Sequence, residues 1–271
     1  MERKRGLNKL IPPGTEQSGK PDTVALEISG IHKVFHPDSG GKVHALRGVD
    51  MVVYEGEFVA LVGATGCGKT TLLNLIAGLD APDSGQLRMS ERLLLGRNIA
   101  YVFQHYTLFP WRSVLQNVAF GLQMRHIPRA ERRRKAFGLV SKVGLAGFES
   151  AYPHELSGGM RQRAAIAQAL AIRPRLLLMD EPFGAVDDTT RSELQQMITD
   201  LWQENHTTVL FVTHNIDEAI VLGTRVLVFS ERPGRIVHEF EVDLPRPRNR
   251  MTKEFTELFV EIRQSLSGQL D

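Results

Sequence analysis

The chain has 271 residues, of which 42% are hydrophobic and 24% are charged, and its formal net charge is +2. This near-neutral balance gives no support to a scaffold that holds nucleic acid through bulk charge. A membrane span needs about 18 consecutive apolar residues, whereas the longest apolar runs, 176–179 and 209–212, have the length of strands. We therefore do not expect the chain to cross a bilayer by itself.

The cysteine content and the N-terminus indicate a reducing, cytosolic setting. The single Cys excludes an internal disulfide, and no apolar stretch follows the basic N-terminal residues. Residues 1–24 combine basic side chains with Gly, Pro and Ser, so we predict a disordered tail there.

Short apolar runs alternate with segments of helical periodicity along the rest of the chain. The predicted strands are 25–28, 52–54, 57–62, 99–103, 176–179, 208–213 and 226–229. The predicted helices are 69–77, an inserted helical stretch from about 104 to 156, and then 157–171, 189–203, 215–222 and an amphipathic helix at 252–266. Uniformly apolar strands that alternate with helices predict an α/β fold with a parallel sheet covered on both faces.

A glycine-rich segment joins the strand 57–62 to the helix 69–77. It reads Gly63-Ala-Thr-Gly66-Cys67-Gly68-Lys69-Thr70 and fits the phosphate-loop pattern GxxxxGK[ST] in the context that this motif requires. Its backbone N–H groups are expected to converge on an anion at the helix N-terminus. We expect Lys69 to reach the β- and γ-phosphates, Thr70 to hold Mg²⁺ and Thr71 to contact the α-phosphate. The predicted nucleotide contacts are Gly63, Ala64, Thr65, Gly66, Cys67, Gly68, Lys69, Thr70 and Thr71.

Cys67 has two interpretations within this loop. It occupies a variable position of the motif, where it serves as a small spacer. Alternatively, a thiol at a helix N-terminus is reactive, so that alkylation would inhibit hydrolysis and bound nucleotide would protect the enzyme.

Two carboxylates directly follow the apolar strand 176–179. Asp180 is placed to position Mg²⁺ through water, as a Walker B aspartate does, and Glu181 to polarise the attacking water. Solvated acids at a strand end are the plain alternative, but the phosphate loop favours the catalytic interpretation.

Two further polar residues are expected near the same edge of the sheet. His214 follows the strand 208–213 and precedes a helix whose start is marked by Asn215 and Glu218. Ligands of open α/β sheets bind at the carboxyl ends of the strands, which favours a catalytic histidine over a structural one. Gln104 stands at the joint between sheet and helical insertion, where it is able to couple metal occupancy to movement of the insertion.

The segment Leu156-Ser157-Gly158-Gly159-Met160 opens a helix with two glycines in its first turn, which lowers helix propensity. Together with the phosphate loop, Gln104, Asp180-Glu-Pro182, Ala185-Val-Asp187 and His214, it resembles the ATP-binding-cassette (ABC) ATPases over about residues 25–244. The resemblance implies a P-loop NTPase cassette with a RecA-like parallel core, an antiparallel β subdomain and a helical subdomain at about 105–170. It also implies one ATPase domain, 25–245, followed by a C-terminal helical extension, 246–271.

The resemblance further implies how ATP and Mg²⁺ are held. In a head-to-tail dimer, the LSGG segment of one protomer, with Ser157, Gly158 and Gly159, binds the ATP that lies on the phosphate loop of the other. Asp187 belongs to the dimer-contact loop, Phe35 stacks on adenine with His36 as the alternative, and Thr70, Gln104 and Asp180 hold the metal. Glu181, His214 and Gln104 are the catalytic set. The family usually has Gln where Met160 stands, which removes half of a capping box, and Leu where Val186 stands.

Within the family, the chain resembles the importer ATPases, because no membrane domain is fused to the cassette in this sequence. Leu108-Phe-Pro-Trp111, Asp180-Glu-Pro-Phe183 and Ser230-Glu-Arg-Pro-Gly234 are similar to the group that imports nitrate, sulfonates, taurine or bicarbonate. The implied partners are a second copy or a paralogous ATPase, transmembrane permease subunits and, indirectly, a solute-binding protein, with no nucleic acid. The implied location is the cytoplasmic face of the inner (plasma) membrane, as a peripheral subunit.

Two alternative functions and one surface feature stay open at this point. An ABC ATPase that acts on nucleic acid or in translation is disfavoured because the chain has one cassette, one Cys and no sustained heptads. A nucleotide sensor without turnover is disfavoured by Lys69, Glu181 and His214. The basic run 129–135 indicates a solvated helix face or, alternatively, a contact with anionic lipid headgroups.

Overall fold

The protein is described by a computed structural model over residues 23–38, 40–93, 98–105, 107–184 and 186–268. Most of the predicted tail, 1–24, lies outside these residues. The tail prediction is one residue too long at its end, because Val24 begins the first strand.

A six-stranded sheet forms the centre of the fold, in the order β5-β6-β7-β3-β8-β9. The pairs β5·β6, β6·β7, β7·β3 and β3·β8 are parallel, and β9 joins the edge antiparallel to β8. All residues of β3, β6, β7 and β8 are buried, as the uniformly apolar runs predicted. The strands are β3 (Phe58–Val62), β5 (Ile99–Val102), β6 (Leu176–Asp180), β7 (Thr208–Thr213), β8 (Arg225–Phe229) and β9 (Ile236–Glu241).

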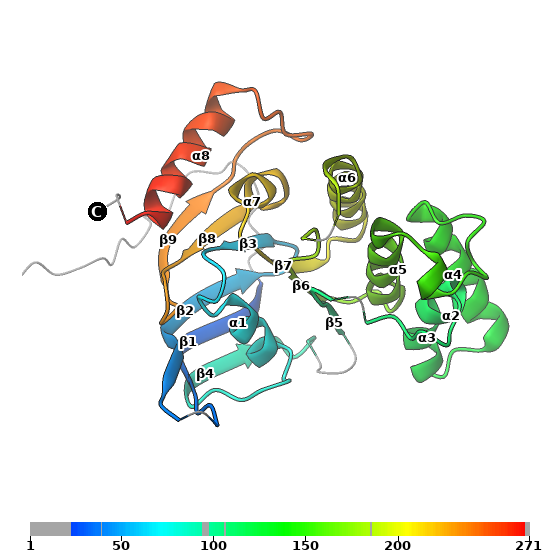
Figure 1. Ribbon diagram of the computed structural model, residues 1–271, viewed down its shortest axis with the longest axis horizontal. Helices are drawn as coiled ribbons and strands as arrows, with labels where there is room; N and C mark the ends of the chain where they lie inside the picture. The colour runs from blue at the N-terminus through cyan, green and yellow to red at the C-terminus, as the bar shows by residue number, and fades with distance from the viewer. Residues whose placement is uncertain (1–22, 39, 94–97, 106, 185, 269–271) are drawn as a thin grey trace, which may run out of the picture.

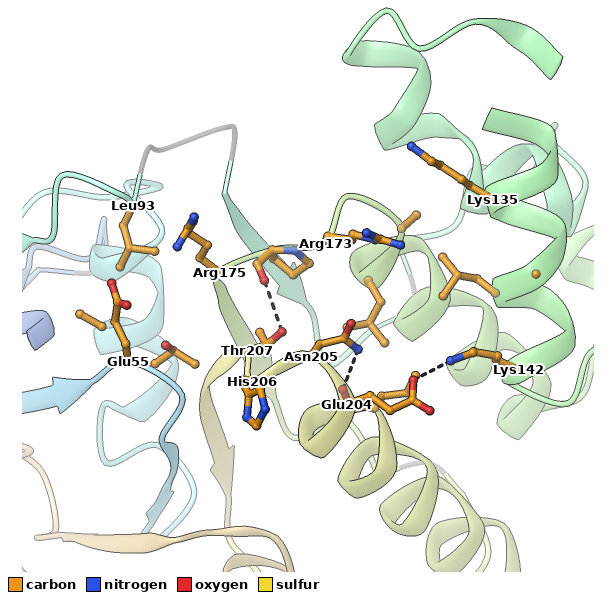
Figure 2. A pocket seen from close by; sticks show the side chains of 18 of the residues that line it. Glu55, Leu93, Lys135, Lys142, Arg173, Arg175, Glu204, Asn205, His206 and Thr207 are labelled. Atoms are coloured by element: carbon orange, nitrogen blue, oxygen red, sulfur yellow. Dashed lines mark hydrogen bonds and ion pairs between the residues drawn. The ribbon is translucent and has the colours of Figure 1, made fainter. Parts of the chain in front are cut away.

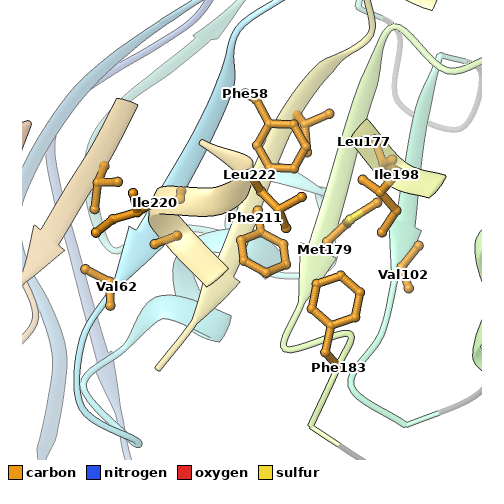
Figure 3. Packing of buried hydrophobic residues seen from close by; sticks show 14 of the residues in the cluster. Phe58, Val62, Val102, Leu177, Met179, Phe183, Ile198, Phe211, Ile220 and Leu222 are labelled. Carbon is orange, nitrogen blue, oxygen red and sulfur yellow. The ribbon is translucent and has the colours of Figure 1, made fainter. Parts of the chain in front are cut away.

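Helices cover one face of this sheet. They are α6 (Asp188–Asn205), α7 (Ile216–Leu222) and α8 (Lys253–Leu266), and Figure 1 shows α7 and α8 beside β8 and β9. In the core beneath them, the ring of Phe211 lies 6.0 Å from that of Phe58 and 5.7 Å from that of Phe183 (Figure 3). Phe255 and Ile262 of α8 belong to the same cluster, so the C-terminal helix packs as part of the core.

A second sheet and one helix cover the other face. The antiparallel sheet has the order β2-β1-β4, with β1 (Val24–Phe35), β2 (Val43–Tyr54) and β4 (Ser84–Met89), and α1 (Lys69–Ile76) packs with it in a second hydrophobic cluster. The strands predicted at 25–28 and 52–54 are therefore parts of a long hairpin. The strands β4 and β9 were not predicted from the sequence.

Four helices form a separate group beyond β5 and β6 (Figure 1). They are α2 (Val114–Val118), α3 (Phe120–Met124), α4 (Arg129–Lys142) and α5 (Gly158–Ala171), and their buried side chains form a third cluster. The predicted helical insertion thus consists of several short helices and the longer α4 and α5. Within the described residues, no helix has the length and apolar character that a membrane span requires.

Candidate active site

The predicted functional residues that follow strands meet at one edge of the central sheet. Val62 of β3 pairs with Thr213 of β7, and Asp180 of β6 pairs with Val212. Because these strands are parallel, the chain leaves all three at the same edge. The residues that come next are Gly63, Glu181 and His214.

The phosphate loop lies at this edge between β3 and α1. Lys69 is only 4% exposed, and its ammonium group donates hydrogen bonds to the carbonyl oxygens of Gly63 (2.8 Å) and Ala64 (2.9 Å). Ala64, Thr65, Gly66 and Thr70 are exposed, and Thr71 is half-buried. Gly68 is the N-cap of α1 with a φ of 114°, a conformation that favours glycine. The loop therefore presents its backbone to solvent beside a buried cation.

Two close backbone contacts hold the loop in place. A Cβ on Gly68 would lie 2.6 Å from the carbonyl oxygen of Ala45 in β2, and a Cβ on Gly234 would lie 2.2 Å from that of Cys67. Gly234 also donates its N–H to Ala45 O at 2.9 Å. The segment around Gly234 therefore packs directly against the phosphate loop. Its sequence had indicated only a similarity to the importer group.

Cys67 packs inside the protein. Its side chain is 2% exposed, and its Sγ atom lies 3.7 Å from Lys69 Nζ. This burial favours the spacer interpretation. The alkylation hypothesis stays a prediction.

Thr70 and Asp180 bring two oxygen atoms together at the start of α1. The Thr70 hydroxyl donates to Asp180 Oδ1 at 3.1 Å, and Tyr101 on β5 donates to Asp180 Oδ2 at 3.5 Å. Burial raises the pKa of Asp180, and the Thr70 hydrogen bond opposes this shift. Burial also raises the pKa of Tyr101, which keeps the phenol protonated as a donor. Hydroxyl and carboxylate oxygens are the ligands that Mg²⁺ prefers, so this pair fits the metal.

Glu181 connects two of the predicted catalytic residues. His214 Nδ1 lies 3.1 Å from Glu181 Oε2, and Gln104 Nε2 lies 3.5 Å from the same oxygen. Glu181 has a φ of 42°, which is strained for a residue with a side chain and is frequent at functional sites. The geometry brings Glu181, His214 and Gln104 together, but it does not test their catalytic roles.

A buried network of hydrogen bonds and an ion pair lies beneath His214 and was not predicted from the sequence. Glu218 accepts a hydrogen bond from the Thr213 hydroxyl at 2.6 Å and lies 3.4 Å from Arg191 Nε on α6. The N-cap at Asn215 is confirmed, since its side chain accepts from the backbone of Asp217 and Glu218. The Glu218 carboxylate, however, points to Thr213. Burial raises its pKa.

The LSGG segment lies outside this constellation. Ser157 caps α5 by accepting from the Met160 N–H at 3.2 Å, and Gly158 and Gly159 take the first two helical positions. Figure 1 draws α5 beside the other helices of its group and well apart from α1. Within one chain, the LSGG segment therefore does not meet the phosphate loop.

Asp187 and Phe35 are the two remaining residues that were predicted to contact the nucleotide or the partner protomer. Asp187 is the N-cap of α6, and hydrogen bonds from Thr190 hold its pKa below the usual range. Phe35, at the end of β1, is 40% exposed, with Lys33 Nζ 5.2 Å from its ring centre. It pairs with Val43, two residues before the Ala45 that touches Gly68. Its position is compatible with adenine stacking, and so is that of the exposed His36.

A strand–loop–helix phosphate site, with the carboxylates of the neighbouring strand beside it, defines a P-loop ATPase. Comparison with known proteins places it more closely, since residues 46–184 match the family described as ABC transporter. The chain belongs to this family, and it is an ATPase of the ABC type.

Relatives of similar length share close to half of its residues. A nitrate import ATP-binding protein of Synechocystis sp. is 45% identical over 90% of this chain and 96% of its own. An ABC transporter ATP-binding protein of Methanocaldococcus jannaschii is 48% identical over 86% of this chain and 88% of its own. Two further relatives of similar length, both 45% identical, are named for import of taurine and of aliphatic sulfonates. A longer relative, of which the match covers 35%, is 44% identical and is named for bicarbonate transport.

Solved structures agree with the fold. The dimeric, post-hydrolysis ATP-binding cassette MJ0796, bound to ADP and Pi, matches with a TM-score of 0.72 at 31% identity. The match covers 80% of this chain and 98% of the cassette. The predicted fold class, an ABC cassette with a parallel core, an antiparallel sheet and a helical insertion, is confirmed.

Proposed function

We propose that this chain is the ATP-hydrolysing subunit of an importer for a small anion of the nitrate, sulfonate, taurine or bicarbonate kind. The observation that carries the hydrolytic part is the contact of Glu181 Oε2 with His214 Nδ1 at 3.1 Å, at the sheet edge that holds the phosphate loop. The names of the relatives support the transport part.

In this proposal ATP binds with its phosphates on the loop 63–68. Lys69 exchanges its contacts with the Gly63 and Ala64 carbonyls for phosphate oxygens. Thr70, Asp180 and Gln104 would hold Mg²⁺, which would supply positive charge to neutralise charge developing on the phosphates. Glu181 orients and polarises the attacking water, and His214 positions the Glu181 carboxylate.

The proposal includes a head-to-tail dimer. Ser157, Gly158 and Gly159 leave N–H groups at the start of α5, where they are suited to bind a phosphate that the same chain does not supply. The dimeric cassette among the similar structures supports a second ATPase copy as the partner.

The experiment replaces Glu181 by Gln, with Glu204→Gln as the matched control, because Glu204 is an exposed residue near the end of α6. We expect the E181Q variant to bind ATP, to lose turnover by about 10²–10⁴-fold and to elute as an ATP-dependent dimer in size-exclusion chromatography. The control keeps wild-type turnover. Normal hydrolysis by the E181Q variant would contradict the role of Glu181.

A rigid exposed turn is the proposed contact with the permease. Trp111 is 71% exposed, and Asn117, fully buried, holds the turn by accepting from Phe109 N (2.7 Å) and donating to Arg112 O (2.9 Å). We expect Trp111→Ala to reduce permease-stimulated ATPase and solute uptake, with little effect on turnover of the isolated subunit. Unchanged uptake would reject this contact. Uptake of each of the four anions by the complete complex then identifies the solute.

A further inference from the structure

A basic groove of about 680 Å³ lies at the edge of the sheet opposite to the candidate active site. Arg175 and Thr207, which line it, directly precede β6 and β7, whereas Asp180 and His214 stand at the other ends of these strands. Five residues of β6 separate the two edges by about 16 Å. The groove is therefore distinct from the phosphate loop.

The groove carries an excess of positive charge contributed by two parts of the fold. Its cationic side chains are Arg134, Lys135, Lys142, Arg173 and Arg175, and its acidic ones are Glu55 and Glu204. Figure 2 shows Lys135 and Lys142 coming from α4 on one side, with Arg173 and Arg175 on the chain leading into β6. An occupant of the groove would thus bridge the helical group and the central sheet.

The acidic groups of this region are already paired. Glu204 accepts from Lys142 at 2.6 Å, Glu55 lies 3.2 Å from Arg92, and Lys135 lies 2.7 Å from Glu131 on its own helix. Within the described part of the chain, Arg134, Arg173 and Arg175 have no ion pair. Arg134 shares the charge of Glu131 with Lys135, since both cations hold the pKa of that carboxyl below its usual range. Arg173 and Arg175 are thus the two arginines of this concave surface without an acidic partner among the described residues.

Helix ends nearby reduce this excess but do not cancel it. The C-terminal ends of α4, α5 and α6 lie at the groove and contribute about half a negative charge each. Five cationic and two acidic side chains line the groove, so a net positive charge remains after the helix ends are counted, and a bound anion offsets it.

The backbone gives a second, independent indication. Arg173 and His206 both line the groove with positive φ, 48° and 49°, at turns after helices where glycine is the usual residue. A side chain at such a position costs about 1–3 kcal/mol of strain, and strained residues concentrate at ligand sites. Glu181 in the candidate active site shows the same strain.

We propose that this groove binds a small anion bearing two or more phosphate groups. Arginine forks donate paired hydrogen bonds to phosphate oxygens. In Figure 2, Arg173 points toward α4, while Arg175 points toward Leu93 and Glu55, so that cationic groups face both ends of the groove. Its volume falls within the range of about 300–1,000 Å³ that is usual for small-molecule sites, and it exceeds the space that one phosphate fills.

The test is equilibrium dialysis of inorganic pyrophosphate against the full chain, with saturating ADP and Mg²⁺ to fill the phosphate loop. The groove variant is Arg134→Gln, Arg173→Gln and Arg175→Gln. The control variant is Arg129→Gln, Arg132→Gln and Arg133→Gln, which changes the net charge equally on residues of α4 that line a different groove.

We expect saturable binding to the wild-type chain, weakened about tenfold or more in the groove variant and about twofold or less in the control. Absence of saturable binding to the wild-type chain, or an equal loss in both variants, would overturn the proposal. Co-sedimentation with phosphatidylglycerol vesicles distinguishes the source of the phosphate. Vesicle binding lost only in the groove variant assigns a lipid headgroup, and vesicle binding that is absent or unchanged assigns a free phosphate compound.

Discussion

Thr190 lies so close to Gly159 that a Cβ placed on the glycine would come 2.5 Å from the Thr190 Cγ2 atom. The same threonine donates its hydroxyl to Asp187 Oδ2 at 2.7 Å. The start of α5, with the LSGG segment, and the start of α6, with the proposed dimer-contact residue, are therefore packed as one unit within the chain.

This contact predicts that Gly159→Ala destabilises the protein by about 1–3 kcal/mol, because a methyl group is forced into an occupied space. Adding Thr190→Ser removes the clashing methyl, keeps the hydroxyl for Asp187 and restores most of the loss. Thermal unfolding of both single variants and the double variant measures this coupling. Strictly additive effects would show that the contact is not responsible.

A matched control lies on α4. A Cβ at Gly138 would meet nothing within 4 Å, so Gly138→Ala is expected to stabilise the protein by about 0.4–1 kcal/mol by restricting the unfolded chain. Opposite signs for the two glycine substitutions would separate the local clash from a general effect of replacing helical glycine.

At Asp180, stability and function oppose each other. Because burial raises its pKa above the ordinary 3.8, the native state keeps a proton that the unfolded state has lost as pH rises. Stability therefore falls as pH rises from about 3.8 through the native pKa, and the full cost is present above that pKa.

Asp180→Asn removes this cost. Its amide oxygen still accepts the hydrogen bond from Thr70. We therefore expect a higher melting temperature than wild type near pH 8, and this difference should shrink toward pH 4. The variant should also lose ATP hydrolysis. Thermal scans of both proteins from about pH 4 to about pH 8 measure the difference. A difference that grows toward low pH would contradict the assigned direction of the pKa.

The buried strands and the motifs that follow them could be predicted from the sequence, but the exposed strand β4 could not. Buried strands and their following motifs were predictable because the phosphate loop, Asp180 and His214 each depend on a local pattern of apolar strand and polar end. By contrast, β4 has an almost fully exposed pattern, and only its pairing with β1 makes it a strand.

The network under His214 shows the same limit. Glu218 marks the helix start in sequence, yet its carboxylate bonds Thr213 and faces Arg191, which is 27 residues away along the chain. The bracing of Cys67 by Gly234 likewise joins segments that no local pattern relates. Such contacts follow from the order of the strands, which the sequence pattern leaves open.

The network makes a prediction about Thr213. Thr213→Val removes the hydrogen bond to buried Glu218 and the acceptor for the Asn215 N–H, which lies 3.0 Å away. We expect a loss of about 1–3 kcal/mol in stability and a lower kcat with little change in ATP affinity, because His214 follows this residue. Thr213→Ser keeps the hydroxyl and serves as the control. Equal kcat for the two variants would exclude a positioning role for the hydroxyl.

Arg248 and Arg250 allow a last comparison between two arginines of the C-terminal segment. The Arg248 guanidinium donates to Val242 O at 2.9 Å and to the carbonyl oxygens of Ile220 and Gly223 at the end of α7. Arg250 instead forms a partly exposed ion pair with Asp217 at 2.7 Å, the two side chains being 43% and 28% exposed. It also donates to the side-chain oxygen of buried Gln195 at 3.1 Å.

Arg248→Ala leaves several carbonyl groups without a donor, so we expect a loss of about 3 kcal/mol in stability. Arg250→Ala is expected to cost less, about 1–2 kcal/mol, because solvent screens the ion pair with Asp217 and only the hydrogen bond to Gln195 is buried. Urea unfolding of both variants measures the difference. Since α7 begins directly after His214 and Asn215, a loosened end of this helix in the Arg248 variant should also lower ATP turnover. Equal losses of stability in the two variants would show that the carbonyl contacts at the end of α7 contribute no more than the Arg250 contacts with Asp217 and Gln195.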